Sequence, residues 1–529
     1  MAVKLHRIAT AAGSALTLAA AERVALVGGG AVDVAAAAAL SAMVGEVGRC
    51  SLGGSAFVMV RVPGRVAEVI DGGYASPGLQ RPRHARAPVW RARGQSPGTS
   101  GGVLDLFDLV SAGDGAGDGG ALDVGPASVA VPGALAAVEA LWRRYGTLPW
   151  RELVAPALEL ARDGFVPLGA TEGAAGSGPA SGQGAQETAK RDDGDGERHG
   201  DGEPAPVRML ALADALDYIA REGARGFYQG DIAALLARAL AESGGHLTRA
   251  DMAAYQATRR ASQTLASGEF TLALNPAPAI GGVAAGLIIE RLQRAWARAA
   301  ETPDSAARAR MQAEAQAEAL GALSELEVPA VDSLAWQHQL SRALLATSTT
   351  HLSVTSADGW AIAITAAMGH DSGVSVPEVG VVWNNAASRL PRDRDGLLQA
   401  RPGQRLISPL CPAIGWHARD PRVIALGSPG GPRIASAVAQ VWARYALEGL
   451  GPEAAVLAPR LHVEATSEGE RIHCEPGIAA AGLKGGASLR RYEQLDGYFG
   501  GVNCAAIDAR GEPQSVCDRR RDGAASVIG

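Results

Sequence analysis

The chain has 529 residues, of which 47% are hydrophobic and 20% are charged, and its formal net charge is −6. This apolar content is enough for a large core, which excludes a disordered chain, a collagen and a small disulfide scaffold. The basic residues are almost all arginine and form no basic cluster, so we expect no nucleic-acid partner. The five cysteines lack zinc spacing, and no apolar stretch is long enough to span a bilayer.

Two alanine-rich segments open the chain, at residues 1–21 and 34–43. The first lacks the leucine-rich core of a signal peptide, so we interpret both as helices of the mature fold and expect a cytoplasmic protein. Residues 24–30 resemble a strand that runs into a glycine turn, as in a dinucleotide site. However, Asp33 stands where the third glycine of that fingerprint belongs, which favours a simple join between two helices.

Helical spacing continues through the first part of the chain. It predicts helices at 134–145, 151–163 and 232–243, a further helix after an N-cap at Thr248, and two exposed helices within 295–326 that Pro303 separates.

Two segments differ in composition from the rest of the chain. Residues 94–126 and 169–206 are rich in glycine, serine and aspartate, and the second has almost no large apolar residue, so we predict that 169–206 is a disordered insertion. The D-G-D-G run at 193–196 lacks the other ligands of a calcium loop, and we predict no metal site.

Strand patterns dominate after residue 347. Residues 352–365 alternate on both sides of Ala357-Asp358-Gly359, which predicts a hairpin, and residues 379–385 and 422–426 read as further strands. A helix is expected at 434–447. Strands in a central block with helices before and after favour a layered architecture in which helices cover the sheets.

Two short motifs are suited to acyl chemistry. Gly427-Ser428-Pro429-Gly430-Gly431 lies between a predicted strand and a predicted helix, where outward-pointing amides stabilise a developing negative charge. Ser428 lacks the G-x-S-x-G context of a serine nucleophile. Thr349 follows Ser348 where the strands begin, and threonine becomes an effective nucleophile when it is the first residue of a chain, because its own α-amine then accepts the proton. A tight turn and a polar strand start are the structural alternatives.

A series of further motifs decides between these readings. In chain order the sequence resembles the γ-glutamyltranspeptidase family of N-terminal-nucleophile hydrolases at GGAVD (29–33), LGGSAF (52–57), VAVPG (129–133), RYGTLPW (144–150), FYQG (227–230), GGHLT (244–248), GG (281–282), TTHLSV (349–354), NN (384–385), PGQR (402–405), GSPGG (427–431), APR (458–460) and YFGG (498–501).

The resemblance implies an α+β fold, a four-layered αββα sandwich, made as one precursor that cuts itself between Ser348 and Thr349. The large subunit would be residues 1–348 and the small subunit residues 349–529, and the two would stay together as a heterodimer. It further implies Thr349 as the nucleophile, backbone amides of Gly430 and Gly431 as oxyanion donors, and a supporting hydroxyl at Thr365. The substrate would be a small-molecule amide, with no metal or organic cofactor.

Other implied positions depart from the family. Gly72, Gly73 and Tyr74 replace an arginine that holds the substrate's α-carboxylate, and Arg389 stands near the place of an aspartate that takes the α-ammonium. Met368-Gly369 replaces an asparagine. Of two neighbouring serines, Ser408 remains and the second is Pro409, with Cys411 and Ala413 following.

These departures leave several alternatives open. The chain is either a γ-glutamyl hydrolase or transferase with a rebuilt pocket, or a divergent acylase of the cephalosporin-acylase or oxamate-amidohydrolase type, or an uncut scaffold without activity. Ser408, which is retained, is a candidate substrate-binding residue. Candidate residues for a rebuilt pocket are His370 and Asp371, with Arg49 and Arg433 as further possibilities. We expect His351 to pack beneath the strand and to orient rather than react.

Overall fold

The computed structural model of the chain describes residues 6–80, 90–91, 123–166, 206–325, 348–391, 398–466, 469–483 and 487–529. Most strands within these ranges form two antiparallel sheets. The larger sheet has seven strands in the order β18-β1-β9-β10-β2-β3-β6. Their bounds are Ala524–Ile528, Ile8–Ala12, Ser348–Ser356, Ala361–Gly369, Ser55–Arg61, Glu68–Gly72 and Thr258–Ala261.

The second sheet has six strands in the order β17-β16-β12-β11-β8-β7. Their bounds are Pro513–Val516, Asn503–Ile507, Val423–Gly427, Ala413–His417, Phe270–Leu274 and Gln263–Ser267. Two small sheets complete the strands: β13 (Leu461–Thr466), β14 (Gly469–Cys474) and β15 (Ser488–Arg491) form one, and β4 (Trp90–Arg91) and β5 (Asp123–Val124) form the other.

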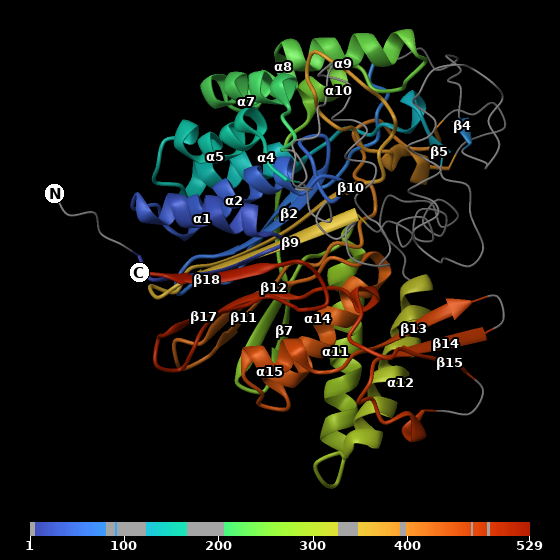
Figure 1. Cartoon of the computed structure of the whole chain (residues 1–529). Helices are drawn as coiled ribbons and strands as arrows, with labels where there is room; N and C mark the ends of the chain where they lie inside the picture. The colour runs from blue at the N-terminus through green and yellow to red at the C-terminus, as the bar shows by residue number, and fades with distance from the viewer. Residues whose placement is uncertain are drawn as a thin grey trace, which may run out of the picture.

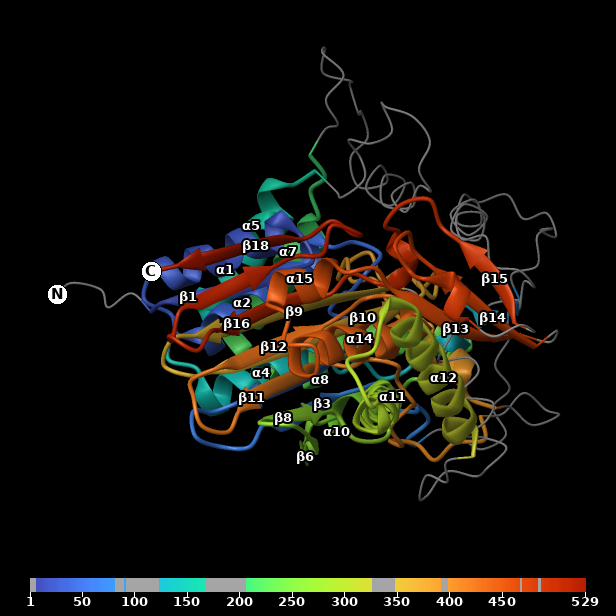
Figure 2. The same ribbon diagram turned by 90° about the horizontal axis from the view of Figure 1, so that it is seen from below.

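Helices lie outside both sheets (Figure 1). Those beside the seven-stranded sheet come from the first half of the chain: α1 (Ala15–Leu26), α2 (Ala31–Gly45), α4 (Ala134–Tyr145), α5 (Trp150–Asp163), α7 (Leu210–Glu222), α8 (Ala224–Gln229), α9 (Asp231–Glu242) and α10 (Arg249–Ala254). Those beside the six-stranded sheet are α11 (Ile280–Arg298), α12 (Ser305–Ser324), α14 (Ile434–Ala446) and α15 (Pro452–Leu457). The view from below shows α14 and α15 over the six-stranded sheet and α12 beside β13 (Figure 2).

Alternation along the strands divides the apolar residues into two cores. In the seven-stranded sheet, Val58, Ile364 and Leu352 join a cluster with α1, α2, α4 and α5. Their neighbours Phe57 and Met59 join a second cluster with the six-stranded sheet, α11 and α14. The faces of the two sheets therefore pack against each other, and strand β9 contacts β12 and β16 of the second sheet.

Most predicted elements are confirmed. Helices α4, α5, α9 and α14 lie within a residue or two of their predicted bounds, and the hairpin forms as β9 and β10. The Thr248 side chain accepts a hydrogen bond from the Asp251 amide and caps α10 as expected. Residues 24–26 end α1 and residues 27–30 join it to α2, which confirms the simple helix join rather than a dinucleotide turn.

Three expectations are wrong in part. The first alanine-rich segment begins with strand β1, because Ile8 to Ala12 pair with both β18 and β9. Residues 379–385 form no strand but only isolated bridges at Trp383 and Asn384. The helix after Pro303 is not simply exposed, since it buries Ala319 and Leu323, and the helix before Pro303 starts at Ile280, well before the predicted range. The predicted insertions lie almost wholly outside the described residues, as does the D-G-D-G run.

Candidate active site

Strand β9 begins at Ser348, so Thr349 is the second residue of a central strand, and its side chain is buried. Thr349 pairs with Ala367 of β10 and Ser348 pairs with Gly369, across a register shift between those two β10 residues. Alternation places Thr349, His351 and Ser353 on one face of β9, because Leu352 and Val354 enter the helix-facing core. The Thr349 side chain is thus on the face toward the six-stranded sheet.

A hydrogen-bonded network surrounds His351, two residues along β9 from Thr349. His351 Nδ1 lies 2.8 Å from Thr365 Oγ1, and Nε2 lies 2.9 Å from Ser353 Oγ. The Ser353 hydroxyl donates to the Asn503 carbonyl over 3.1 Å, so it accepts from Nε2–H. This pattern assigns the proton of the neutral ring to Nε2 and leaves Nδ1 to accept from Thr365.

Burial keeps this imidazole neutral. It lowers the pKa of His351 from 6.5 to about 3, and the side chain has no exposed surface. The ring is covered by Gly427, the last residue of β12, where an added Cβ would lie 2.4 Å from His351 Cε1. The side-chain amide of Asn503 donates to the His351 carbonyl over 2.8 Å. His351 is therefore packed and oriented as expected, and it joins strands from both sheets.

Thr365 lies across from His351 rather than from Thr349. The residue directly across from Thr349 is Ala367, which carries no hydroxyl. Thr365 thus contacts the ring of His351, two residues along β9 from Thr349.

The glycine turn starts where β12 covers His351. Gly430 and Gly431 both have positive φ, at 133° and 56°, a region that side chains with a Cβ rarely adopt. The turn leads into a short 3-10 helix, η4 (Gly431–Arg433), and then into α14. Ser428 donates to the Pro429 carbonyl over 2.6 Å and accepts from the Gly501 amide over 3.0 Å, so this hydroxyl fixes the turn.

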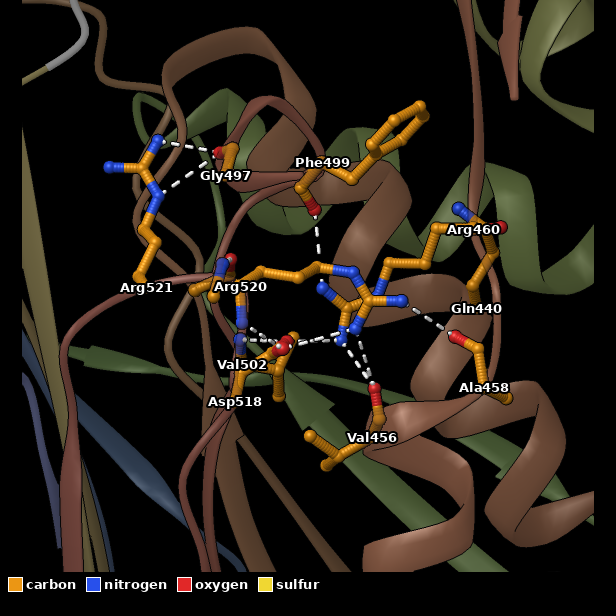
Figure 3. Close-up of polar contacts among 12 residues, drawn as sticks. Gln440, Val456, Ala458, Arg460, Gly497, Phe499, Val502, Asp518, Arg520 and Arg521 are labelled. Carbon is orange, nitrogen blue, oxygen red and sulfur yellow. Dashed lines mark hydrogen bonds and ion pairs between the residues drawn. The ribbon is translucent and has the colours of Figure 1, made fainter. Parts of the chain in front are cut away.

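A second loop, residues 497–502, packs against the glycine turn. Gly500 Cα lies 3.1 Å from where a Cβ on Gly430 would stand. Arg460 Nη1 donates to the Phe499 carbonyl over 3.2 Å, Asp518 accepts from the Val502 amide over 2.9 Å, and Arg521 donates to the Gly497 carbonyl (Figure 3). These contacts fix the loop against which the turn rests.

The side chains that hold this loop form a buried ionic cluster of Arg460, Asp518, Arg520 and Glu475. Asp518 lies 2.6 Å from Arg460 and 3.0 Å from Arg520, and Arg520 lies 2.5 Å from Glu475; none of the four side chains has exposed surface. Burial alone would raise the pKa of Asp518, but Arg460 and Arg520 lower it. The sequence pattern indicated Arg460 through the APR motif but gave no sign of Asp518 or Arg520.

The predicted substrate residues lie in two places. His370 and Asp371 follow the end of β10, next to Gly369, and are partly exposed. The Asn385 side chain accepts from the His370 amide over 3.1 Å, and Asp371 accepts from the Gly373 amide over 2.8 Å. Burial raises the pKa of Asp371 to about 6. Both residues therefore lie near the start of β9.

Ser408 is held against the start of α11. It is buried, its hydroxyl accepts from the Leu410 amide over 3.3 Å, and its carbonyl accepts from the Gly281 amide. The next residue, Pro409, lines a mainly apolar pocket together with Gly431. The Ser408 segment and the glycine turn thus meet at one pocket.

Two further arginines that the sequence singled out have structural contacts. Arg49 pairs with Asp522 over 2.9 Å and donates to the Gly13 carbonyl over 3.1 Å. Arg433 donates to the Tyr498 carbonyl over 3.0 Å, as part of the support for the loop at 497–502.

A third group of residues gathers around Gly369. A Cβ there would lie 3.4 Å from Arg389 Nη2 and from Asn385 Oδ1, and 3.9 Å from the Tyr74 hydroxyl. Tyr74 donates to the Ala367 carbonyl over 2.8 Å, and the Arg389 guanidinium carbon lies 5.9 Å from the Tyr74 ring centroid. Arg389 is only 6% exposed. The resemblance had placed Arg389 near the position of a substrate-binding aspartate, and the structure has its guanidinium beside Gly369, the cross-strand partner of Ser348.

Neither a metal cluster nor a membrane span is found in the part of the chain that the structure describes. No group of three or more His, Cys, Asp and Glu side chains there is arranged to hold a metal ion. No helix in the same ranges is both long and apolar enough to cross a bilayer.

The chain is similar in sequence or fold to several known proteins. The chain is 27% identical over 464 residues to "Glutathione hydrolase 5 proenzyme" of Homo sapiens, covering 77% of this chain and 78% of that protein. It is 29% identical over 273 residues to "Oxamate amidohydrolase proenzyme" of Klebsiella pneumoniae, covering 48% and 51%. The crystal structure of cephalosporin acylase from Bacillus halodurans shares the fold, with a TM-score of 0.73, 21% identity and coverage of 99% and 96%.

The family itself follows from a match along nearly the entire sequence. The sequence model described as Gamma-glutamyltranspeptidase matches residues 18–327 and 329–528. The matched residues include the Thr349 strand, the glycine turn and the loop that supports it. The chain therefore belongs to the γ-glutamyltranspeptidase family.

Proposed function

We propose that this protein is a self-processing amide hydrolase or acyltransferase of the γ-glutamyltranspeptidase type, with Thr349 as its nucleophile. The observation that carries the proposal is the place of Thr349: near the start of a central strand, buried, and on the face toward the strand that ends in the glycine turn. Membership of the family supports the reaction class. The names of two relatives, both proenzymes, support processing.

Processing requires that the Thr349 hydroxyl attacks the carbonyl carbon of Ser348. The Ser348–Thr349 C–N bond breaks as an ester forms on Thr349 Oγ, and water then hydrolyses this ester. The products are a carboxylate on Ser348 and a free α-amine on Thr349. That amine is then placed to accept the hydroxyl proton of the same residue.

Turnover repeats the attack on a substrate amide. Thr349 Oγ forms an acyl-enzyme as the amine leaves, and water or a second amine then takes the acyl group. The backbone amides of Gly430 and Gly431 would donate to the tetrahedral oxyanion, each contributing about 3 kcal/mol to the lowering of the barrier. His351, kept neutral by burial and hydrogen-bonded to Thr365 and Ser353, fixes the strand that carries the nucleophile.

Strand pairing supports the proposal that two fragments would remain together after such a cut. Strand β9 of the proposed small subunit, residues 349–529, pairs on one side with β1 of the proposed large subunit, residues 1–348. Strand β10 likewise pairs with β2. We therefore propose a heterodimer whose shared sheets and outer helices form the four-layered αββα sandwich of N-terminal-nucleophile hydrolases.

A second candidate differs only in the acyl group. At Gly73 an added Cβ would lie 2.9 Å from Asp71 Oδ1 and 3.0 Å from Phe57 Cζ, so no side chain reaches the substrate from that position. Arg389 brings a positive charge to the start of β9, where an ammonium would be repelled. These two features favour an acylase on a non-glutamyl amide over a glutathione hydrolase.

Substitution of the nucleophile tests the proposed function. Thr349→Ala should leave the chain uncut and lower kcat/KM for amide hydrolysis by roughly 10⁴-fold or more, because no other group takes the place of Oγ. Thr350→Ala is the matched control, since its hydroxyl lies on the opposite face near Gly13. It should still mature. A Thr349→Ala protein that is cut after Ser348 would show that another nucleophile acts.

A further inference from the structure

We propose that the apolar pocket beside the glycine turn binds an unbranched aliphatic acyl chain, so that the preferred substrates are amides of medium-chain carboxylic acids. This inference rests on the proposed function and specifies the acyl group that Thr349 would receive. It depends on where the pocket begins, on its uncharged lining, and on its length along two helices.

The pocket begins at the glycine turn. Gly431, whose amide would donate to the oxyanion, lines it together with Pro409 and with Gly281, the second residue of α11. Gly281 and Pro409 are packed so closely that a Cβ on Gly281 would collide with the Pro409 carbonyl. A substrate whose carbonyl oxygen meets the Gly431 amide would therefore have the next atoms of its chain at the entrance of this pocket.

Two helices give the pocket its apolar walls. Helix α11 packs against both α12 and α14. It contributes Ile280, Ala284 and Ile288 to the lining, and α12 contributes Ala319, Leu320 and Leu323. Residues three or four apart share one face of a helix, so each helix presents an apolar stripe to the pocket. Burying each methylene of an aliphatic chain against such stripes is favourable.

The lining carries no charge. Among the described residues that line the pocket there is no Asp, Glu, Lys or Arg. The Gln316 amide bonds to backbone groups of β13 over 3.3 Å and 3.0 Å, and Ser436 donates to the Arg433 carbonyl over 3.0 Å and lies 2.9 Å from His462 Nδ1. Burial lowers the pKa of His462 well below its usual value, so this ring is neutral. A carboxylate or an ammonium would lose its hydration here without gaining a charged partner, which disfavours both.

The length of the pocket fits a chain of medium size. From Ile280 to Ile288 the axis of α11 rises about 12 Å, which is the length of an extended alkyl chain of roughly eight to ten carbons.

The acyl group, rather than the amine, suits this pocket. It stays bonded to Thr349 from the first attack until hydrolysis, whereas the amine must leave, and water or a second amine must enter, between the two steps. Lining residues such as Ile280, Ala319 and Leu323 are buried, so the pocket suits the group that remains.

A series of anilides with acyl chains of increasing length tests the pocket. From acetyl through butyryl and hexanoyl to octanoyl, kcat/KM of the mature enzyme should rise by roughly 2- to 4-fold for each added methylene, and dodecanoyl should bring no further rise. Acetamides of butylamine, hexylamine and octylamine form the matched series, in which the chain is on the amine, and they should show no such rise.

Filling the pocket should remove this preference. Ala284→Phe places an aromatic ring among the lining residues, and it should lower the ratio of the octanoyl to the acetyl kcat/KM by at least 10-fold. Ala297→Phe, at an exposed position of the same helix, is the matched control and should keep the wild-type ratio.

Titration calorimetry with 1-octanol separates this proposal from the proposed function, since binding requires no turnover. The alcohol should bind the wild type at least 10-fold more tightly than Ala284→Phe. Equal binding, a flat acyl series, or a rise in the amine series instead would overturn the acyl pocket while leaving the reaction type intact. A chain that neither matures nor hydrolyses any amide would overturn the proposed function, and the calorimetry would then decide alone whether the pocket binds an aliphatic chain.

Discussion

The polar residues around His351 are uncharged, whereas those behind the glycine turn are two arginines and two carboxylates. His351, Thr365, Ser353 and Asn503 satisfy one another by hydrogen bonds at the face of β9 that carries Thr349. The ionic cluster of Arg460, Asp518, Arg520 and Glu475 does not contact the glycine turn directly but holds the loop at 497–502, which packs against it.

This difference suggests that the two groups of residues have different roles. The proposed base is the α-amine of Thr349, and a charge beside it would shift its pKa through Coulomb interaction. Neutral partners hold the strand without such a shift. In the loop at 497–502, several backbone N–H and C=O groups need hydrogen-bond partners. Arginine and aspartate side chains have several donors or acceptors each, so a few of them can satisfy these groups.

Removing one charge from the ionic cluster should have the largest effect. Asp518→Asn keeps an acceptor for the Val502 amide but leaves two buried arginines facing Glu475 alone. We expect the free energy of unfolding to fall by about 3–5 kcal/mol, measured by urea denaturation.

The matched control for Asp518 is Glu512→Gln, which breaks a surface pair with Arg7 and should change stability little. Equal losses in the two variants would contradict the importance assigned to the buried cluster.

A single methyl group should disturb the neutral network. Gly427→Ala places a Cβ 2.4 Å from the His351 ring, so the ring or strand β12 must move. Overpacking of this kind costs about 1–3 kcal/mol, and displacement of His351 should also slow processing at Thr349. Gly451→Ala, in a position where an added Cβ meets no neighbour, is the control. If Gly427→Ala matures at the wild-type rate in a time course on gels, the network does not position the nucleophile.

The neutral state of His351 also predicts a pH dependence of stability. Its pKa is about 3 in the folded chain against 6.5 ordinarily, so the unfolded chain binds the additional proton. Stability is therefore fully present above pH 6.5 and is lost as the pH falls toward 3. Over that window the wild type should lose about 1.4 kcal/mol per pH unit more than His351→Gln, as measured by urea midpoints. Parallel profiles would mean that His351 titrates normally.

Local signals made much of the fold predictable. The Thr248 cap, the break at Pro303 and the Ala357-Asp358-Gly359 turn each act within a few residues, and each lies where expected. The strand expected at 379–385 does not form, because the apolar residues of this segment are buried in a loop. Trp383, for example, is fully buried but makes only an isolated bridge.

Site residues could be predicted from the sequence only where they lie together in one short segment. Thr349 and the two glycines stand in short motifs, but the residue across from Thr349 depends on the register shift between Ala367 and Gly369. The partners of Arg460 come from a segment about sixty residues later in the chain, and no pattern in the sequence links Arg460 to Asp518. Such pairings arise from tertiary packing.

Intact mass spectrometry of the purified wild-type protein tests the central claim most directly. Our account predicts two fragments, residues 1–348 and 349–529, with Thr349 at the new N-terminus. A single uncut chain that persists for days, or a cut at another bond, would contradict the assignment of Thr349 as the nucleophile.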